Sequence, residues 1–317
     1  MIFAVWIPLL VPLLAVPAAR RLAESLPPRA AAWLLTGCAV ALAACTTAAL
    51  GLLLTAGALR LPPVAALGHL SLPLLGGDPV VSLPAAAAAA GLLTACALAA
   101  VHRARRHHTE LRTARLATGA HPATGDLCVL PDSAPDAYAL PGRPGRVVVT
   151  AGMVRALPPD EREALFAHER AHLAGRHHLF LLTVALAAVC HPLLRSLRAP
   201  LAYALERWAD ESAAVRVGDR RLTARAIGRA ALASRPGLPS HRPGTVLAAT
   251  AGPVPRRVAA LLAPERPAAP SPRTAAHGRR LIAAALLACV TFSAAAALDA
   301  AADLHETVEV AQGEATH

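Results

Sequence analysis

Two histidines and a glutamate with helical spacing are the residues of this sequence best suited to chemistry. The segment LFAHERAHLAGRHHLF, residues 165–180, contains His168, Glu169 and His172. Positions i and i+4 of an α-helix lie on one face, so the two imidazoles can bind one metal ion. Glu169 is offset from them and can reach a water molecule beside that ion. The spacing predicts one catalytic Zn²⁺ per chain, with His168 and His172 as ligands and Glu169 as the general base.

A catalytic zinc ion needs a third protein ligand, and one candidate is His178. Through Gly175, this residue would complete the pattern His-Glu-x-x-His-x-x-Gly-x-x-His. That pattern also requires a methionine turn further along the chain. The methionines of the sequence, Met1 and Met153, both precede His178. The pattern is therefore incomplete, and a ligand from a later helix is favoured.

Glu206 is the favoured third ligand. It lies in the segment ALERWADESAA, on a helix expected over residues 200–217. Asp210 follows one helical turn later on the same face, where its carboxylate can accept a hydrogen bond from a ligand histidine. Glu211 is close in sequence but points to another side of that helix. We predict that Glu206 binds the metal and that Asp210 orients a ligand.

The residues around the motif indicate the elements that position it. Residues 156–175 are expected to form a helix, because a Pro-Pro-Asp start is followed by acidic residues and Gly175 can end the helix. The β-branched runs DLCVL (126–130) and RVVVT (146–150) are bounded by proline and glycine and indicate strands. Together these elements predict an α+β zinc peptidase domain.

The composition indicates that this domain is attached to a lipid bilayer. Hydrophobic residues make up 55% of the 317 residues and charged residues only 16%, which is too apolar for an ordinary soluble domain. A span needs about 20 apolar residues. Four runs meet this length: 1–19, 30–59, 79–101 and 281–298. The expected fold class is a mainly α integral membrane protein with about four transmembrane helices.

Arginines set the expected sidedness. They follow the first and third runs, and such residues favour the cytoplasmic side. This places the N-terminus and the acidic tail outside and the metal site in the cytoplasm, in a multi-pass protein expected in a bacterial plasma membrane. The net charge is +11, but no basic face is interleaved with aromatic residues, so direct nucleic-acid binding is not expected.

These features divide the chain into five predicted regions. The segment at 179–194 is apolar but short for a span. If Glu206 shares a metal with His168, this segment enters the membrane and returns, lies in the interface, or packs as a buried helix. The regions are an N-terminal membrane region (1–101), a cytoplasmic zinc peptidase domain (102–232), a Pro/Arg-rich linker with one short helix (233–280), a C-terminal span (281–298) and an extracytoplasmic tail (299–317).

The order of spans and zinc domain resembles peptidase family M56, the membrane metallopeptidases that include β-lactam sensors. The matching segments are RVVVTAGMVRALPPDEREALFAHERAHLAGRHH and LERWADESAA. The resemblance implies zinc ligation by His168, His172 and Glu206, with Glu169 as the base. It also implies that RVVVT is an edge strand that pairs with an extended substrate. The implied substrate is a protein or peptide, such as a cytoplasmic winged-helix repressor.

The resemblance ends after the last predicted span, where no penicillin-binding domain or Ser-x-x-Lys motif follows, so β-lactam sensing is not expected. Peptidase family M48 has the same zinc pattern and is the alternative within the enzymes. That family usually places full spans between its two ligand helices, whereas this chain has one short apolar run there. A non-catalytic membrane signalling protein with a relic zinc site is the alternative outside the enzymes.

Overall fold

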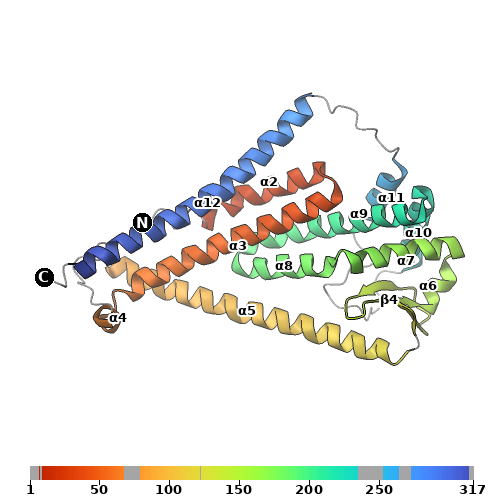
Figure 1. The fold of residues 1–317 in the computed structure, drawn as a ribbon, viewed down its shortest axis with the longest axis horizontal. Helices are drawn as coiled ribbons and strands as arrows, with labels where there is room; N and C mark the ends of the chain where they lie inside the picture. The colour runs from red at the N-terminus through yellow and green to blue at the C-terminus, as the bar shows by residue number, and fades with distance from the viewer. Residues whose placement is uncertain are drawn as a thin grey trace.

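The computed structural model describes residues 7, 9–67, 79–121, 123–234, 253–263 and 273–313. Long helices run side by side over most of its length, and a small sheet lies at one end (Figure 1). The helices of the apolar part are α2 (Pro12–Ser25), α3 (Pro28–Ala58), α4 (Pro62–Leu67), α5 (Pro79–Gly119) and α12 (Arg273–Gly313).

Within the described residues, three helices are long and apolar enough to cross a membrane: Pro28–Ala58, Ser82–Gly119 and Leu281–Val310. A bent pair, Pro159–Ala174 and His177–Cys190, reaches the same threshold only when it is taken as one element. Of the predicted first span, residues 1–6 and 8 lie outside the described residues. The apolar helices indicate a membrane protein, with three spans, or four if the bent pair is one, by length and composition.

Small residues allow the apolar helices to approach closely. A Cβ atom on Gly57 of α3 would lie 2.2 Å from the Cβ atom of Ala86 of α5, so glycine is needed at this crossing. The largest buried cluster joins α2, α3 and α12 to two further helices, α8 (His177–Cys190) and α9 (Arg198–Val217). Leu35 of α3, Val184 of α8 and Leu205 of α9 are fully buried in it.

The sheet has the strand order β1-β2-β4-β3. Strand β2 is parallel to β4, and β3 is antiparallel to β4. RVVVT forms β4, an interior strand paired on both sides, so the expectation that it is an edge strand is wrong. The run AYAL occupies the free side of β4 as strand β3, although alanine is a weak strand former. The strands are β1 (Ala123–Thr124), β2 (Leu127–Leu130), β3 (Ala137–Leu140) and β4 (Arg146–Thr150).

The remaining helices build the region around the motif. The predicted helix over 156–175 is α7 (Pro159–Ala174), preceded by the short helix α6 (Ala151–Ala156). Arg176 takes a left-handed backbone conformation, with φ of 49°, and the chain bends by 52° into α8. After α8, a 3-10 turn η2 (Pro192–Leu197) reverses the chain into α9, which runs beside α8 (Figure 1).

Two short helices cover α9, and the last helix is longer than the predicted span. They are α10 (Arg220–Ala233) and α11 (Val254–Leu262), the latter at the predicted helix of the linker. The rest of the linker lies outside the described residues up to the start of α12. Helix α12 continues through the predicted tail to Gly313, because this segment is rich in alanine and contains an i,i+4 pair between His305 and Glu309.

Candidate metal centre

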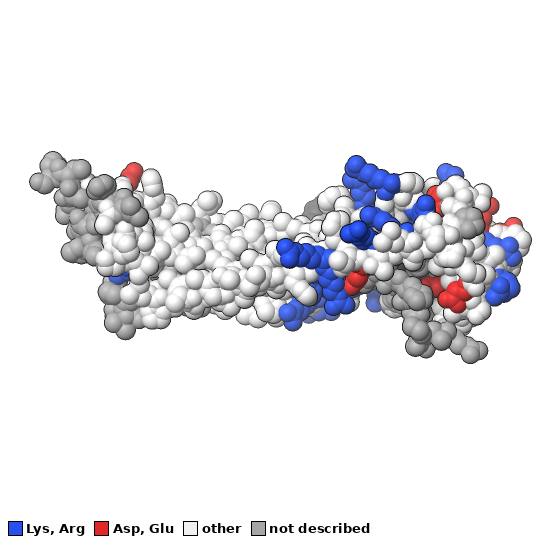
Figure 2. All heavy atoms as spheres, turned by 90° about the horizontal axis from the view of Figure 1, so that it is seen from below, with Lys and Arg blue, Asp and Glu red and all other residues white. Residues whose placement is uncertain are grey.

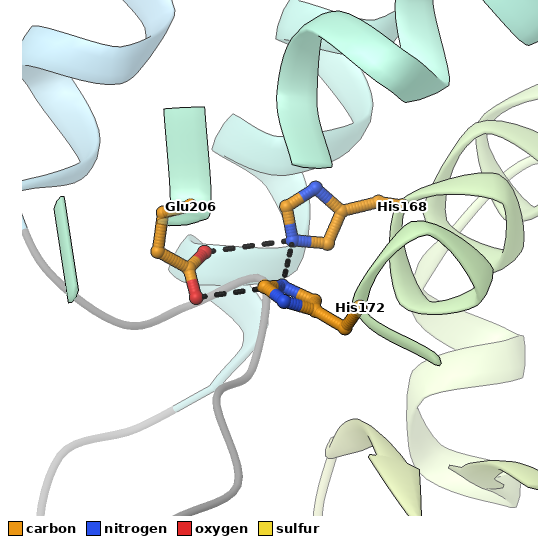
Figure 3. A group of neighbouring side chains, drawn as sticks. All are labelled: His168, His172 and Glu206. Carbon is orange, nitrogen blue, oxygen red and sulfur yellow. Dashed lines mark hydrogen bonds and ion pairs between the residues drawn. The ribbon is translucent and has the colours of Figure 1, made fainter. Parts of the chain in front are cut away.

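Three side chains from two helices converge at one point. His168 and His172 project from α7 toward Glu206 of α9 (Figure 3). One ligand atom from each of the three residues lies within 4.8 Å of the other two. His168 and Glu206 are fully buried and His172 is 4% exposed. The structure thus brings together the three predicted ligands in a group that could hold a metal ion.

The separations between the ligand atoms suit a tetrahedral ion. The Nε2 atoms of His168 and His172 are 3.1 Å apart, and they lie 3.5 and 3.6 Å from the two carboxylate oxygens of Glu206. The distances to Glu206 are too long for good hydrogen bonds. Ligand atoms at about 2.0–2.1 Å from a tetrahedral zinc ion lie about 3.3–3.4 Å apart. The donor set and its spacing therefore fit a zinc ion.

A second carboxylate and a buried arginine support these ligands. The Nδ1 atom of His168 lies 3.0 Å from Oδ1 of Asp210, on the ring edge opposite the metal-facing Nε2 atom. Arg257 of α11 is fully buried, and its guanidinium donates to both oxygens of Asp210 at 2.6 and 2.8 Å. Its Nη1 atom lies 2.7 Å from Oε2 of Glu206. Arg257 thereby fixes both carboxylates of α9.

The electrostatics of the group favour one added positive charge. Burial opposes protonation of His168, but Asp210 and Glu206 outweigh it and raise the pKa of His168 to about 9. Burial, and then the nearby His168, His177 and Arg257, lower the pKa of His172 well below its ordinary value. Burial alone would raise the pKa of Asp210, but Arg257 and His168 lower it. The lowered pKa of Asp210 keeps its carboxylate ionised, and this negative charge favours a cation in the group.

His177, not His178, contacts the site. The Nδ1 atom of His177 lies 2.7 Å from Nδ1 of His172, so the two rings form a hydrogen bond. This bond is on the edge of the His172 ring opposite its metal-facing Nε2 atom. The His177 ring lies against Trp208 of α9, with centroids 4.6 Å apart. A Cβ atom on Gly175 would lie 2.3 Å from Nε2 of His177, so glycine makes room for this ring.

The other predicted residues lie as follows. Glu169 is fully buried on α7 beside the ligands. His178 is half-buried and is not part of the group. Burial, and then the nearby His107 and Arg115 of α5, lower its pKa to about 4. Glu211 binds Arg207 and Arg220 on another side of α9.

The sequence reasoning missed Arg257 and His177. A signal for Arg257 exists, because it falls on the apolar stripe of α11 formed by Val254, Val258 and Leu261 at helical spacing. An arginine within such a stripe is buried only when it is paired. No comparable signal marks His177, whose role depends on the bend between α7 and α8.

Comparison with known proteins finds a similarity to one family over part of the chain. A model of peptidase family M48 matches residues 102–199, from within α5 to the start of α9. M48 is a family of zinc metallopeptidases, and the matched segment includes His168, Glu169 and His172 but not Glu206. No curated protein and no solved structure matches the chain significantly. The match favours the M48 alternative over the M56 resemblance and indicates a metallopeptidase.

Proposed function

We propose that the chain is a membrane-embedded, zinc-dependent endopeptidase of the M48 kind, which hydrolyses peptide bonds of protein or peptide substrates at the cytoplasmic face. The observation that carries the proposal is the convergence of His168, His172 and Glu206 beside Glu169. A buried group of two imidazoles and one carboxylate, next to a further carboxylate, is what a hydrolytic zinc site requires.

The roles of the side chains follow from their places. His168, His172 and Glu206 would hold a zinc ion, which would supply a Lewis acid for the scissile carbonyl and the attacking water. Glu169 accepts the proton of the attacking water and then delivers it to the leaving amine nitrogen. Asp210 holds the imidazole of His168 in orientation, and its burial makes this interaction strong.

The distribution of arginines supports a cytoplasmic site. The guanidinium of Arg29, at the start of α3, lies 5.4 Å from the ring centroid of Trp208 on α9. The basic turn between α2 and α3 therefore lies on the same side as the metal centre. Figure 2 shows basic side chains gathered over that half of the molecule, next to a long uncharged stretch. Positive residues of this kind favour the cytoplasm.

The substrate is proposed only as a protein or peptide. A winged-helix repressor is what the M56 resemblance implies, and the M48 match lends it no support. We therefore retain neither the repressor nor a signalling role in the proposal.

Replacement of Glu169 by Gln tests the activity. The full chain in lipid nanodiscs is incubated with zinc and an unfolded protein such as casein, and the rate of fragment formation is measured. Loss of a general base lowers such rates by about 10²–10⁴-fold. The matched control is Glu163→Gln, which neutralises an exposed carboxylate of the same helix, and it is expected to keep the wild-type rate.

Metal removal completes the test. A zinc chelator is expected to abolish cleavage by the wild-type chain, and added zinc to restore it, because the metal activates the water. Equal cleavage by the wild type and Glu169→Gln would contradict the proposal. Zinc binding without cleavage by either would favour a non-catalytic membrane protein that keeps the site.

A further inference from the structure

A cleft lies between α5 and the hairpin formed by α8 and α9, apart from the metal centre. Its volume is about 600 Å³. Its apolar wall includes Leu92, Ala95 and Ala99 of α5 and Leu182, Ala185 and Val189 of α8. We call it the α5–α8 cleft. None of these wall residues carries a charge, so the wall suits hydrocarbon.

Four arginines from three elements line the same cleft. Arg103 and Arg106 come from α5, Arg195 from η2 and Arg198 from the first position of α9. All four are exposed. Among the described residues that line the cleft, Glu110 is the one acid, and it accepts a hydrogen bond from Arg106 at 2.8 Å. The cleft therefore has an excess of positive charge.

The position of the hairpin sets these arginines at the membrane boundary. The Sγ atom of Cys96 lies 3.4 Å from the carbonyl oxygen of Val189, so the end of α8 is level with Cys96. Val101 ends the uncharged run of α5, and Cys96 lies about 8 Å before it along the helix. Arg195 and Arg198 follow the end of α8, so their backbones lie near the depth of Cys96 in the membrane. At this depth a guanidinium needs an anionic partner or must extend toward water.

We propose that the α5–α8 cleft binds one anionic phospholipid, from the leaflet on the side of the metal centre. The arginines bind the phosphate of the headgroup, and an acyl chain lies along the apolar wall of α5 and α8. Basic pockets between helices at this boundary suit anionic headgroups, because arginine donates bidentate hydrogen bonds to phosphate. The inference rests on the membrane placement of α5 and does not depend on peptidase activity.

Native mass spectrometry of the full chain in detergent tests the proposal, with phosphatidylglycerol and phosphatidylcholine as probes. Phosphatidylglycerol is expected to bind at a concentration at least tenfold lower than phosphatidylcholine does. This difference corresponds to roughly the contribution of one to two arginines. The double variant Arg195→Gln/Arg198→Gln is expected to lose this preference. The matched control Arg216→Gln/Arg221→Gln removes the same charge from exposed positions of α9 and α10 outside the cleft and is expected to keep it.

Two further arms separate a lipid from other anions. Ala185→Phe fills the space beside the apolar wall and leaves every arginine in place, so it is expected to weaken phosphatidylglycerol binding. In the wild type, soluble glycerol phosphate is expected to compete poorly with the lipid. Displacement of the lipid by millimolar glycerol phosphate would overturn the proposal in favour of a simple anion site. Equal losses in the two double variants would also overturn it, since net charge alone would then explain binding.

Discussion

At the scale of the residue, His177 is a neighbour of the metal centre that the His-Glu-x-x-His motif does not predict. Its Nδ1 atom contacts Nδ1 of His172, which leaves the Nε2 atom of His172 directed at Glu206. Partners of this kind fix the tautomer and orientation of a ligand histidine. His177 is itself held between Trp208 and the space that Gly175 leaves. The contact therefore couples the α7–α8 bend to the geometry of a ligand.

Replacing His177 by Phe is expected to weaken zinc binding by roughly 10–100-fold, the usual effect of losing the hydrogen-bond partner of a ligand histidine. Phenylalanine keeps an aromatic ring against Trp208, so the packing is largely retained. The matched control is His178→Phe on the adjacent, half-buried position. Zinc affinity is measured by competition with a chromophoric chelator. Equal affinities of the two variants would refute the positioning role of His177.

The sequence was sufficient to predict which residues lie together at the candidate site, including Asp210 beside His168, but not the supporting residues Arg257 and His177. His168 and His172 follow from helical spacing alone, and Glu206 was chosen over His178 because the methionine turn was missing. In the structure Glu206, and not His178, lies in one group with the two histidines. His177 could not be inferred, because its ring reaches His172 only through the left-handed residue Arg176 after α7. A tertiary bend of this kind leaves no periodic pattern.

At the scale of the element, α11 is part of the metal centre although it lies in the predicted linker. Arg257 from this helix binds Asp210 and Glu206 of α9 in a fully buried position. The apolar side chains of α11 pack against α9 and α10, and Arg220 of α10 donates to the backbone carbonyl of Leu261. The candidate metal site therefore includes a residue beyond 232, the last residue of the predicted peptidase domain.

Replacing Arg257 by Met is expected to lower stability by about 3–5 kcal/mol, because two buried carboxylates lose their counterion. Zinc content is expected to fall as well, since Glu206 is no longer held. Arg257→Lys keeps the charge but not the planar fork, so an intermediate loss is expected. Thermal unfolding and metal content of the full chain in detergent measure both effects.

The neighbouring arginine provides the control for this experiment. Arg256 is exposed, and its guanidinium lies 4.9 Å from the ring centroid of Tyr203. Such a contact contributes about 0.5–1 kcal/mol, so Arg256→Met is expected to change stability little and zinc content not at all. If Arg257→Met were no worse than Arg256→Met, the ion pairs of Arg257 would not support the site.

The elements themselves were predicted unevenly. Helices α7 and α9 follow from start and stop residues and from apolar spacing, and the runs DLCVL and RVVVT form β2 and β4. Strand β3 was missed because AYAL lacks the β-branched residues that mark strands. That omission produced the wrong expectation of an edge at RVVVT. Strand pairing depends on partners distant in sequence, which the local pattern does not contain.

At the scale of the whole molecule, the apolar helices separate an end rich in arginine from an end that is acidic. Arg29 contacts Trp208 near the metal centre. The acidic residues of α12 follow Leu298, in the C-terminal part of this helix, whereas its arginines precede Leu281. In Figure 1 the sheet and the last turns of α12 also lie at opposite ends. The lengths of α3, α5 and α12 suit spans between these ends. We expect one orientation in the membrane, with the arginine-rich end that carries the candidate metal centre in the cytoplasm.

Single cysteines test this orientation in a background without the six native cysteines. Arg216→Cys is at an exposed position of α9 on the side of the metal centre, and Glu306→Cys is at an exposed position of α12 beyond the apolar run. A membrane-impermeant maleimide is expected to label the position-306 variant in intact cells, because the acidic end faces outward. It is expected to label the position-216 variant only after permeabilisation, because positive residues hold that end in the cytoplasm. The reverse pattern would place the metal centre outside the cell, and labelling of both variants in intact cells would exclude α12 as a span.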